Sequence, residues 1–217
     1  VNSIKNLTAL VPNIFIPDYG SRLTSAVYIR GIGSRINTPS VGLYVDNIPY
    51  IDKSAFDFDY SDIERIDVLR GPQGTLYGRN AMGGIIKVHT KSPFSYQGTD
   101  FRIGAGTHNQ YNTSVTHYHR INERFAFSAG GFYDYEGGFF RNAARNNDKL
   151  DKGQSVGGRA RAIYLPSENW KLDFNLSYEY SDQGGYPYGL YDKENGTVAK
   201  PAYDEESSYY RNLLNAG

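Results

Sequence analysis

The chain has 217 residues, a formal net charge of zero and no cysteine, and its length suits one large domain or two smaller ones. Equal numbers of basic and acidic residues leave no global field to recruit nucleic acid. The lack of cysteine excludes disulfide frameworks, thiolate nucleophiles and cysteine-bound metals. A mean hydropathy of -0.57, with no run near the ~20 apolar residues of a spanning helix, excludes a helical membrane protein. It does not exclude a transmembrane barrel, because barrel strands alternate and their average hydropathy stays low.

The first segment, 3–15, predicts a short amphipathic helix. Ile4, Leu7 and Leu10 follow helical spacing, and Pro12 limits the helix on its C-terminal side. Four apolar runs then predict strands separated by turns rich in Gly, Pro, Asn and Ser. They cover residues 26–33, 41–50, 64–71 and 83–90.

A glycine-rich segment joins the last two of these runs. Pro72 near its start and Gly78 near its end predict a short helix. The segment is not a P-loop, because Gly74 and Gly78 enclose three residues rather than four and no Lys-Ser/Thr pair follows. Gly31 and Gly33 also lack the third glycine of a dinucleotide fingerprint. These glycines therefore need an explanation other than a bound nucleotide.

From residue 99 the apolar pattern changes to a period of two. The clearest case is 169–181, whose apolar positions are Trp170, Leu172, Phe174, Leu176, Tyr178 and Tyr180. Similar alternation covers 99–107, 123–136 and 154–165. In the last of these, Arg159 and Arg161 take the polar face. Such strict alternation predicts strands with one apolar and one wet face.

These strands are long enough for a membrane barrel. They exceed the usual ~5–6 residues of soluble strands and reach the ~9–11 residues that cross a bilayer at a tilt. Aromatic residues gather toward their ends, as interfacial girdles require. About five such strands cannot close a barrel, so we expect an internal piece of a longer protein, with further strands beyond Gly217.

The connections between the strands support the same interpretation. Residues 120–123 and 166–169 form short turns, whereas 137–153 and everything after Ser181 are predicted as long polar loops. Short turns at one end and long loops at the other are typical of outer-membrane barrels. The connection at His108–Asn109 is short where a long loop is expected.

Three motifs identify a family resemblance. They are VYIRGIG (27–33), VGLYVDNIPY (41–50) and DIERIDVLRGPQGTLYGRNAMGGIIKVHTK (62–91). Together with the alternating strands that follow, they resemble the plug domain and first barrel strands of TonB-dependent outer-membrane receptors. The resemblance implies an α+β plug, a small mixed sheet with short helices, in residues 1–95. It implies antiparallel strands of a large transmembrane β-barrel, incomplete in this chain, in residues 96–217.

The resemblance also implies a function. Members of this family lie in the outer membrane of Gram-negative bacteria, where the plug gates the barrel lumen and the inner-membrane protein TonB drives uptake. We expect TonB, through a segment upstream of Val1, outer-membrane lipid and a small-molecule solute such as a metal chelate as partners, without nucleic acid, enzyme activity or a cofactor. A ferric siderophore is the first expected solute, with haem, cobalamin or carbohydrate as alternatives. A secreted all-β binding module without transport is the alternative from another class.

The family motif assigns plug and gating residues by position. By resemblance, Arg30 and Arg70 pair with barrel glutamates, which we expect in strands beyond this chain. The glycines are expected to permit tight turns and close backbone approach inside a barrel. The full set is Arg30, Gly31, Arg70, Gly71, Pro72, Gly74, Gly78, Asn80, Gly83 and Gly84.

Solute contacts are expected on three plug loops, 16–22, 33–40 and 49–56, and on the late loop. The candidates are Arg22, Arg35, Asn37, Tyr50, Lys53, Tyr186, Tyr188 and Tyr191. Their side chains suit an oxygen-rich chelate or a sugar and do not separate the two.

Two polar clusters invite other interpretations. His117 and His119 share one strand face and could ligate a metal, but with no third ligand an interfacial or lumen-facing polar pair is favoured. The acidic residues Asp57, Asp59, Asp62 and Glu64 could form a carboxylate site. Turn formation and helix capping explain most of that cluster.

Overall fold

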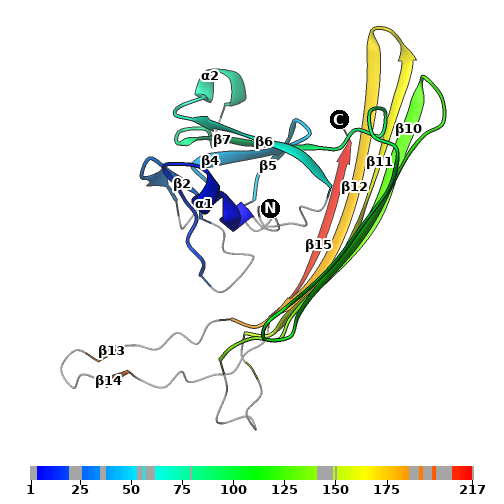
Figure 1. The fold of residues 1–217 in the computed structure, drawn as a ribbon. Helices are drawn as coiled ribbons and strands as arrows, with labels where there is room; N and C mark the ends of the chain where they lie inside the picture. Colours follow the sequence, from blue (N-terminus) through cyan, green and yellow to red (C-terminus); the bar gives the residue numbers. More distant parts are fainter. Residues whose placement is uncertain are drawn as a thin grey trace.

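A computed structural model shows a small N-terminal unit beside a tall, curved antiparallel sheet (Figure 1). We call residues 4–90 the N-terminal unit and the six-stranded sheet the curved sheet. The structure describes residues 4–19, 26–34, 38–52, 56, 62–78, 80–140, 149, 151–185, 191–192, 197–198 and 207–216, the last three ranges by backbone alone.

The chain begins with a short helical segment, as predicted. A 3-10 turn, η1 (Ile4–Asn6), leads into α1 (Leu7–Leu10). Ile4 and Leu7 are buried, whereas Leu10 faces outward. The helical hydrogen bonds stop where the Val11 amide donates to the Leu7 carbonyl, immediately before Pro12, which has no amide hydrogen to continue the series.

A three-stranded antiparallel sheet follows, in the order β1-β2-β3. Its strands are β1 (Ile14–Phe15), β2 (Tyr28–Ile29) and β3 (Ile32–Gly33). The predicted single strand over 26–33 is therefore a hairpin. The reason is the turn at Arg30 and Gly31, whose φ angles of 51° and 81° reverse the chain.

The second sheet of the N-terminal unit has four strands in the order β5-β4-β7-β6. They are β4 (Val41–Val45), β5 (Ile48–Tyr50), β6 (Ile63–Arg70) and β7 (Gly84–Thr90). β4 and β7 pair in parallel, and the other pairs are antiparallel. The predicted run 41–50 is again a hairpin, because Asp46 and Asn47 both have positive φ, at 49° and 71°. The short helix α2 (Gly74–Tyr77) lies between β6 and β7, as predicted, and Gly78 ends it.

The hydrophobic core belongs to the N-terminal unit. The two central strands, β4 and β7, are buried on both faces, which is why their sequences are nearly continuous apolar runs. Helix residues and both small sheets contribute to one cluster of buried side chains. Its members are Ile4, Leu7, Ile14, Ile16, Val27, Ile29, Val41, Leu43, Val45, Phe56, Ile86 and Val88.

The curved sheet is antiparallel throughout, in the order β15-β12-β11-β10-β9-β8. Its strands are β8 (Gly98–Gly106), β9 (Gln110–Arg120), β10 (Phe125–Glu136), β11 (Gly153–Ser167), β12 (Trp170–Gln183) and β15 (Ser207–Ala216). The short strands β13 (Tyr191–Asp192) and β14 (Thr197–Val198) pair with each other.

Two expectations about this half need correction. The prediction that everything after Ser181 is a long loop is wrong, because β12 continues to Gln183 and β15 pairs along it. The sheet therefore has six strands rather than about five. The sequence of β15, SSYYRNLLNA, lacks the strict alternation of its neighbours. Pairing with the free edge of β12, rather than a pattern of its own, accounts for this strand.

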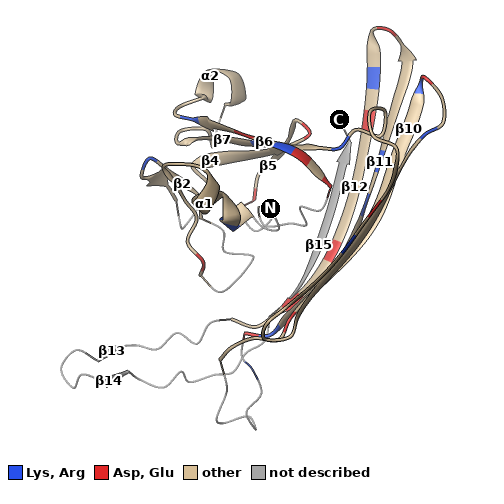
Figure 2. Ribbon diagram, in the orientation of Figure 1, with Lys and Arg blue, Asp and Glu red and all other residues tan. Residues whose placement is uncertain are grey.

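The two faces of the curved sheet differ as the alternation predicts. Large apolar side chains project from one face and remain exposed, among them Phe101, Ile103, Val156, Phe174 and Leu176. Buried polar residues, including Arg161 and Glu179, lie on the other face. Figure 2 shows mostly uncharged ribbon on this sheet, with isolated charged positions along its strands.

The short connection between β8 and β9 has a local cause. His108 and Asn109 both have positive φ, at 61° and 57°, which suits the tight three-residue connection, 107–109, between these antiparallel strands. In the described part of the chain, no helix is long and apolar enough to cross a membrane.

Candidate functional site

Arg161 is the centre of a polar contact between the curved sheet and the N-terminal unit. Its side chain is 8% exposed. Nε and Nη2 donate to the two carboxylate oxygens of Asp173 on β12, at 2.9 and 2.8 Å. Nη1 donates to the Thr90 hydroxyl at 2.8 Å and lies 3.1 Å from an Asp46 oxygen. One guanidinium therefore joins a carboxylate of its own sheet to two side chains of the N-terminal unit.

The N-terminal half of this contact is fixed by its own unit. Parallel pairing brings the ends of β4 and β7 together, so that the turn residue Asp46 meets Thr90. The Thr90 amide and hydroxyl donate to the two Asp46 oxygens at 3.0 and 2.7 Å, and the Asp46 amide donates to the Val88 carbonyl. Contacts within its own unit thus hold the Asp46 carboxylate in place, independently of Arg161.

The other half is fixed by the curved sheet. The two parallel hydrogen bonds between Arg161 and Asp173 are a bidentate arrangement, which sets the orientation of the guanidinium. Asp173 also accepts from Nδ2 of the Asn175 side chain at 3.2 Å, and one of its oxygens lies 2.9 Å from the Lys171 ammonium. Two preorganised halves meet at this point.

A second ion pair lies two residues away on β11. Arg159 Nη1 donates to both carboxylate oxygens of Asp62, at 2.7 and 3.0 Å. Asp62 stands immediately before β6 and is almost buried. Asp62 does stand in a turn, as expected, but its interpretation as a helix-capping residue is wrong, because a strand follows it and its carboxylate binds an arginine. We call the contacts of Asp46, Asp62 and Thr90 with Arg159 and Arg161 the seam.

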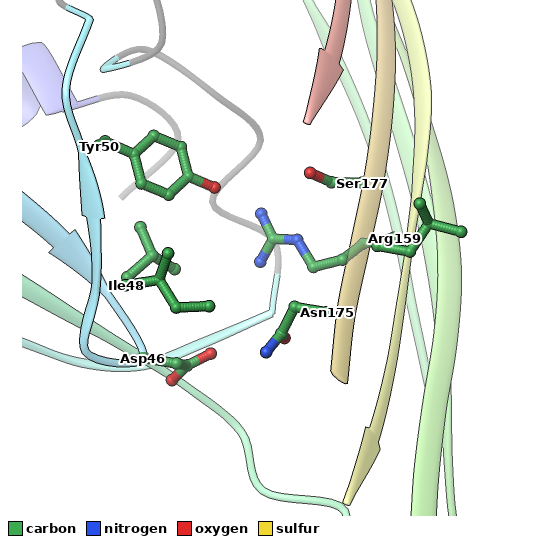
Figure 3. Close-up of a pocket in the computed structure, with 8 residues that line it drawn as sticks. Asp46, Ile48, Tyr50, Arg159, Asn175 and Ser177 are labelled. Carbon is green, nitrogen blue, oxygen red and sulfur yellow. The ribbon is translucent and has the colours of Figure 1, made fainter. Parts of the chain in front are cut away.

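A pocket lies beside the seam, between the β4–β5 hairpin and strands β11 and β12 (Figure 3). Its cavity volume is about 20 Å³, and it is partly open to solvent. Figure 3 shows the Tyr50 hydroxyl and the Arg159 guanidinium pointing toward each other across it. The lining residues are Val45, Asp46, Ile48, Tyr50, Arg159, Asn175, Leu176 and Ser177.

The segment 91–97, which connects β7 to β8 and is called the connector below, is held by a third group of polar contacts. Lys91 forms an ion pair with Asp100 at the start of β8, and its ammonium lies 4.3 Å from the centre of the Tyr96 ring. The Tyr96 hydroxyl donates to Asp100 at 2.7 Å, and this hydrogen bond raises the pKa of Tyr96 above its ordinary value. The Lys91 amide donates to the Asp62 carbonyl, which links the connector to the seam.

The arginines singled out by the sequence motif lie elsewhere. Arg30 sits in the β2–β3 turn, where its amide donates to the Asn13 carbonyl, and its side chain is exposed. Arg70 is also exposed, and its guanidinium donates to the Pro12 carbonyl at 3.4 Å. Among the described residues neither forms an ion pair, so their pairing with barrel glutamates stays a prediction.

The motif glycines differ in what the backbone demands. Gly84 has a φ of 145°, and a Cβ there would lie 2.3 Å from the Leu69 carbonyl oxygen, so only glycine fits without strain. Gly83 has close neighbours, with the Ile32 carbonyl oxygen 2.9 Å from a Cβ position. Gly31, Gly71 and Gly78 have positive φ, and Asn80 does too. Gly74 shows neither a positive φ nor a close neighbour, and nothing in the structure explains it or Pro72 beyond their place beside α2.

Most of the predicted solute contacts lie outside the described residues. These are Arg22, Arg35, Asn37, Lys53, Tyr186 and Tyr188. Tyr191 is described by its backbone in β13. Tyr50 alone of this set has a described side chain, and it lines the pocket.

The histidine pair lies on the outer face of the curved sheet. Cross-strand pairing places His117 opposite Ala129 and His119 opposite Phe127. The two imidazole rings stack with centroids 6.0 Å apart, and His117 Nδ1 lies 2.8 Å from the Thr99 hydroxyl. The described ranges contain no group of three or more metal-ligating side chains.

Sequence reasoning missed the residues that join the two parts. Alternation along β11 does place Arg159 and Arg161 on the polar face, opposite Val156 and Tyr164. Two arginines at i and i+2 on an inward face are a usable signal for a buried acidic partner. Their partners could not be found that way, because Asp62 and Arg159 are 97 residues apart in sequence.

Comparisons with known proteins agree on one family. Residues 1–85 match the TonB-dependent Receptor Plug Domain. The pesticin receptor of Yersinia pestis is 28% identical over 183 residues, covering 82% of this chain and 27% of that protein. The Vitamin B12 transporter BtuB of Vibrio vulnificus is 34% identical over 210 residues, covering 86% of this chain and 32% of that protein. The chain thus spans less than a third of the length of these relatives.

Solved structures give the same result. The ferric yersiniabactin uptake receptor FyuA from Yersinia pestis superposes with a TM-score of 0.78 at 25% identity, covering 96% of this chain and 33% of that one. The pyoverdine outer membrane receptor FpvA from Pseudomonas aeruginosa superposes with a TM-score of 0.68 at 18% identity, covering 88% of this chain and 27% of that one. The second likeness concerns the fold alone.

Proposed function

Because this chain belongs to the TonB-dependent receptors of the Gram-negative outer membrane, we propose that the protein it comes from imports a scarce solute, in the first place a ferric siderophore. The fold is the expected one: a small α+β unit with a mixed sheet, followed by antiparallel barrel strands that do not close within this chain. Its relatives are receptors and transporters rather than enzymes, and they are not secreted binding modules.

The observation that carries the proposal is the inverted polarity of the curved sheet. Its exposed face carries large apolar side chains, and its inner face binds the N-terminal unit through Arg159 and Arg161. A sheet that is apolar outside and polar inside suits lipid on one side and a wet, occupied lumen on the other. The N-terminal unit, in the role of a plug, would then gate that lumen. We set the boundary between plug and barrel at residues 95 and 96.

Relatives support the choice of solute. FyuA takes up ferric yersiniabactin, and FpvA has been seen with pyoverdine bound. These names favour an iron chelate for the present protein. BtuB, a vitamin B12 transporter of 34% identity, favours cobalamin as a second candidate.

The gating proposal assigns roles to residues and partners. TonB is the proposed partner that drives opening, with outer-membrane lipid around the barrel. Arg30 and Arg70 are the proposed plug arginines that meet barrel glutamates beyond this chain. The loops at 16–22, 33–40 and 49–56 are the proposed solute contacts, and Tyr50 would meet the solute where the pocket opens to solvent.

Growth of a deletion strain tests the proposal. The full-length gene should restore growth on a ferric siderophore as the iron source, and restoration should vanish in a strain without TonB. Rescue on cobalamin alone would move the assignment to the second candidate. If the deletion strain grew as well as the parent strain on every iron, haem, cobalamin and glycan source, the proposed transport function would be wrong.

A narrower test addresses Tyr50. Tyr50→Phe removes one hydroxyl from the pocket, and we expect a several-fold weaker solute affinity with unchanged receptor abundance. Tyr44→Phe is the matched control, because the Tyr44 hydroxyl donates to the Tyr77 carbonyl and does not line the pocket. Equal affinities for both variants would remove Tyr50 from the solute contacts.

A further inference from the structure

The seam joins two carboxylates of one part to two arginines of the other. Among the described residues, Arg161 is the cation that contacts Asp46, and Arg159 is the cation that contacts Asp62. Pulling the N-terminal unit away from β11 would break both ion pairs and the hydrogen bond between Arg161 and Thr90. The seam can therefore open only if all of these contacts are lost together.

The seam is also tied to the chain connection between the two parts. Thr90 and Lys91 are consecutive, and Thr90 accepts from Arg161 while Lys91 pairs with Asp100 on β8. The Lys91 amide donates to the Asp62 carbonyl. Asp62, Thr90 and the connector thus hold one another within a few residues of the curved sheet, so little slack chain is available for separation at this point.

The pocket beside the seam is small. Its cavity volume of about 20 Å³ is far below the several hundred Å³ typical of ligand pockets, and it is partly open to solvent. Val45 and Ile48 line it, together with Asp46 and Arg159 of the seam. A solute that touched Tyr50 at its mouth could pass further only if the N-terminal unit and β11–β12 moved apart.

We propose that this seam stays closed throughout transport, so that the four-stranded sheet of the N-terminal unit and the β11–β12 wall remain one fixed body. The passage for solute then opens at another part of the plug's perimeter. This inference rests on the proposed transport function. It adds that the lumen does not open on the side of β11 and β12.

A reversible cross-link across the pocket tests the inference. Ile48→Cys and Ser177→Cys place one thiol on each side of the pocket, and residues 1–217 contain no native cysteine. In the full-length receptor, with any cysteine outside this range replaced, a short bis-methanethiosulfonate would join the two thiols. The matched control is the same double variant treated with a monofunctional methanethiosulfonate of similar size, which fills the pocket without joining its sides.

A fixed seam predicts that cross-linked cells take up solute within about twofold of the control. A drop of tenfold or more that is reversed by dithiothreitol would overturn the inference. Absence of TonB-dependent uptake in the untreated receptor would instead count against the proposed function, so the two failures are distinguishable.

A second measurement does not depend on uptake. The single variant Ser177→Cys is labelled with a water-soluble maleimide in energised cells, with and without TonB and a ferric siderophore. A fixed seam predicts labelling rates within about twofold of each other. A rise of tenfold in energised, solute-treated cells would show that the seam parts, and the inference would be wrong.

Discussion

The N-terminal unit and the curved sheet place their apolar residues in opposite ways. In the N-terminal unit, Leu43, Ile86 and Val88 are buried and most charged side chains face outward. In the curved sheet, Phe174 and Leu176 are about half exposed while Arg161 is buried. Both patterns come from the same rule, since each apolar face avoids water. The difference indicates that the curved sheet suits apolar surroundings on its outer face and a polar interior on its inner face.

The seam is where the two arrangements meet. The N-terminal unit has an apolar core, like a soluble protein, and presents polar residues at its edges. The curved sheet presents a polar inner face. Buried ion pairs of this kind do not by themselves add much stability relative to apolar packing, but breaking one side is costly. They therefore fix how the two parts dock more than how strongly each part folds.

The largest expected effect comes from breaking the seam at Arg161. Arg161→Met leaves Asp46 and Asp173 without their guanidinium, and we expect a loss of about 3–5 kcal/mol in the stability of the docked state. Denaturant unfolding of the full-length receptor in detergent measures it. A triple variant, Arg161→Met with Asp46→Asn and Asp173→Asn, should recover most of the loss. Equal stability of Arg161→Met and wild type would contradict the importance of the seam.

A core substitution in the N-terminal unit should act independently of the curved sheet. Leu43 is fully buried in β4, so Leu43→Ala should cost about 3 kcal/mol through lost burial and a cavity. Protease resistance of the plug, followed with temperature, reports it. The melting of the barrel strands should remain unchanged, and a parallel fall in barrel stability would show that the two parts do not fold as separate units.

Two exposed leucines should respond in opposite ways to a charge. Leu176 on β12 is 51% exposed, and Leu10 at the end of α1 is 64% exposed. If lipid covers Leu176, Leu176→Arg should cost about 2 kcal/mol, because a charge enters the apolar band. Leu10→Arg should cost less than about 1 kcal/mol at a wet surface. Refolding equilibria in lipid vesicles measure both, and similar costs would refute the inverted polarity.

The smallest effect is expected at an exposed ion pair within the N-terminal unit. Asp67 lies 3.1 Å from Arg65 and 3.1 Å from His89, but its side chain is 41% exposed. Asp67→Asn should change stability by less than about 1 kcal/mol, since solvent screens such pairs. Denaturant unfolding of the full-length receptor in detergent measures this change. A loss of stability as large as that of Arg161→Met would contradict the distinction between buried and surface charges.

Much of the fold could be predicted because local patterns determine it. Strict alternation identified β8, β10, β11 and β12 to within about two residues, since one face of each strand meets a single environment. Proline and glycine correctly bounded α2. The hairpins at Arg30–Gly31 and Asp46–Asn47 were missed, because apolar residues continue on both sides of each turn. β15 was missed because its sequence carries little pattern.

The sequence by itself determined the two kinds of sheet and the family, because periodicity and the ordered motif of residues 62–91 are local properties of the chain. The tertiary structure decided which charges meet. Asp46, Thr90 and Arg161 are far apart in sequence, and only the parallel pairing of β4 with β7 and the docking of that sheet against β11 bring them within hydrogen-bonding distance. An ion pair depends on a distance in space, and no local pattern encodes that distance.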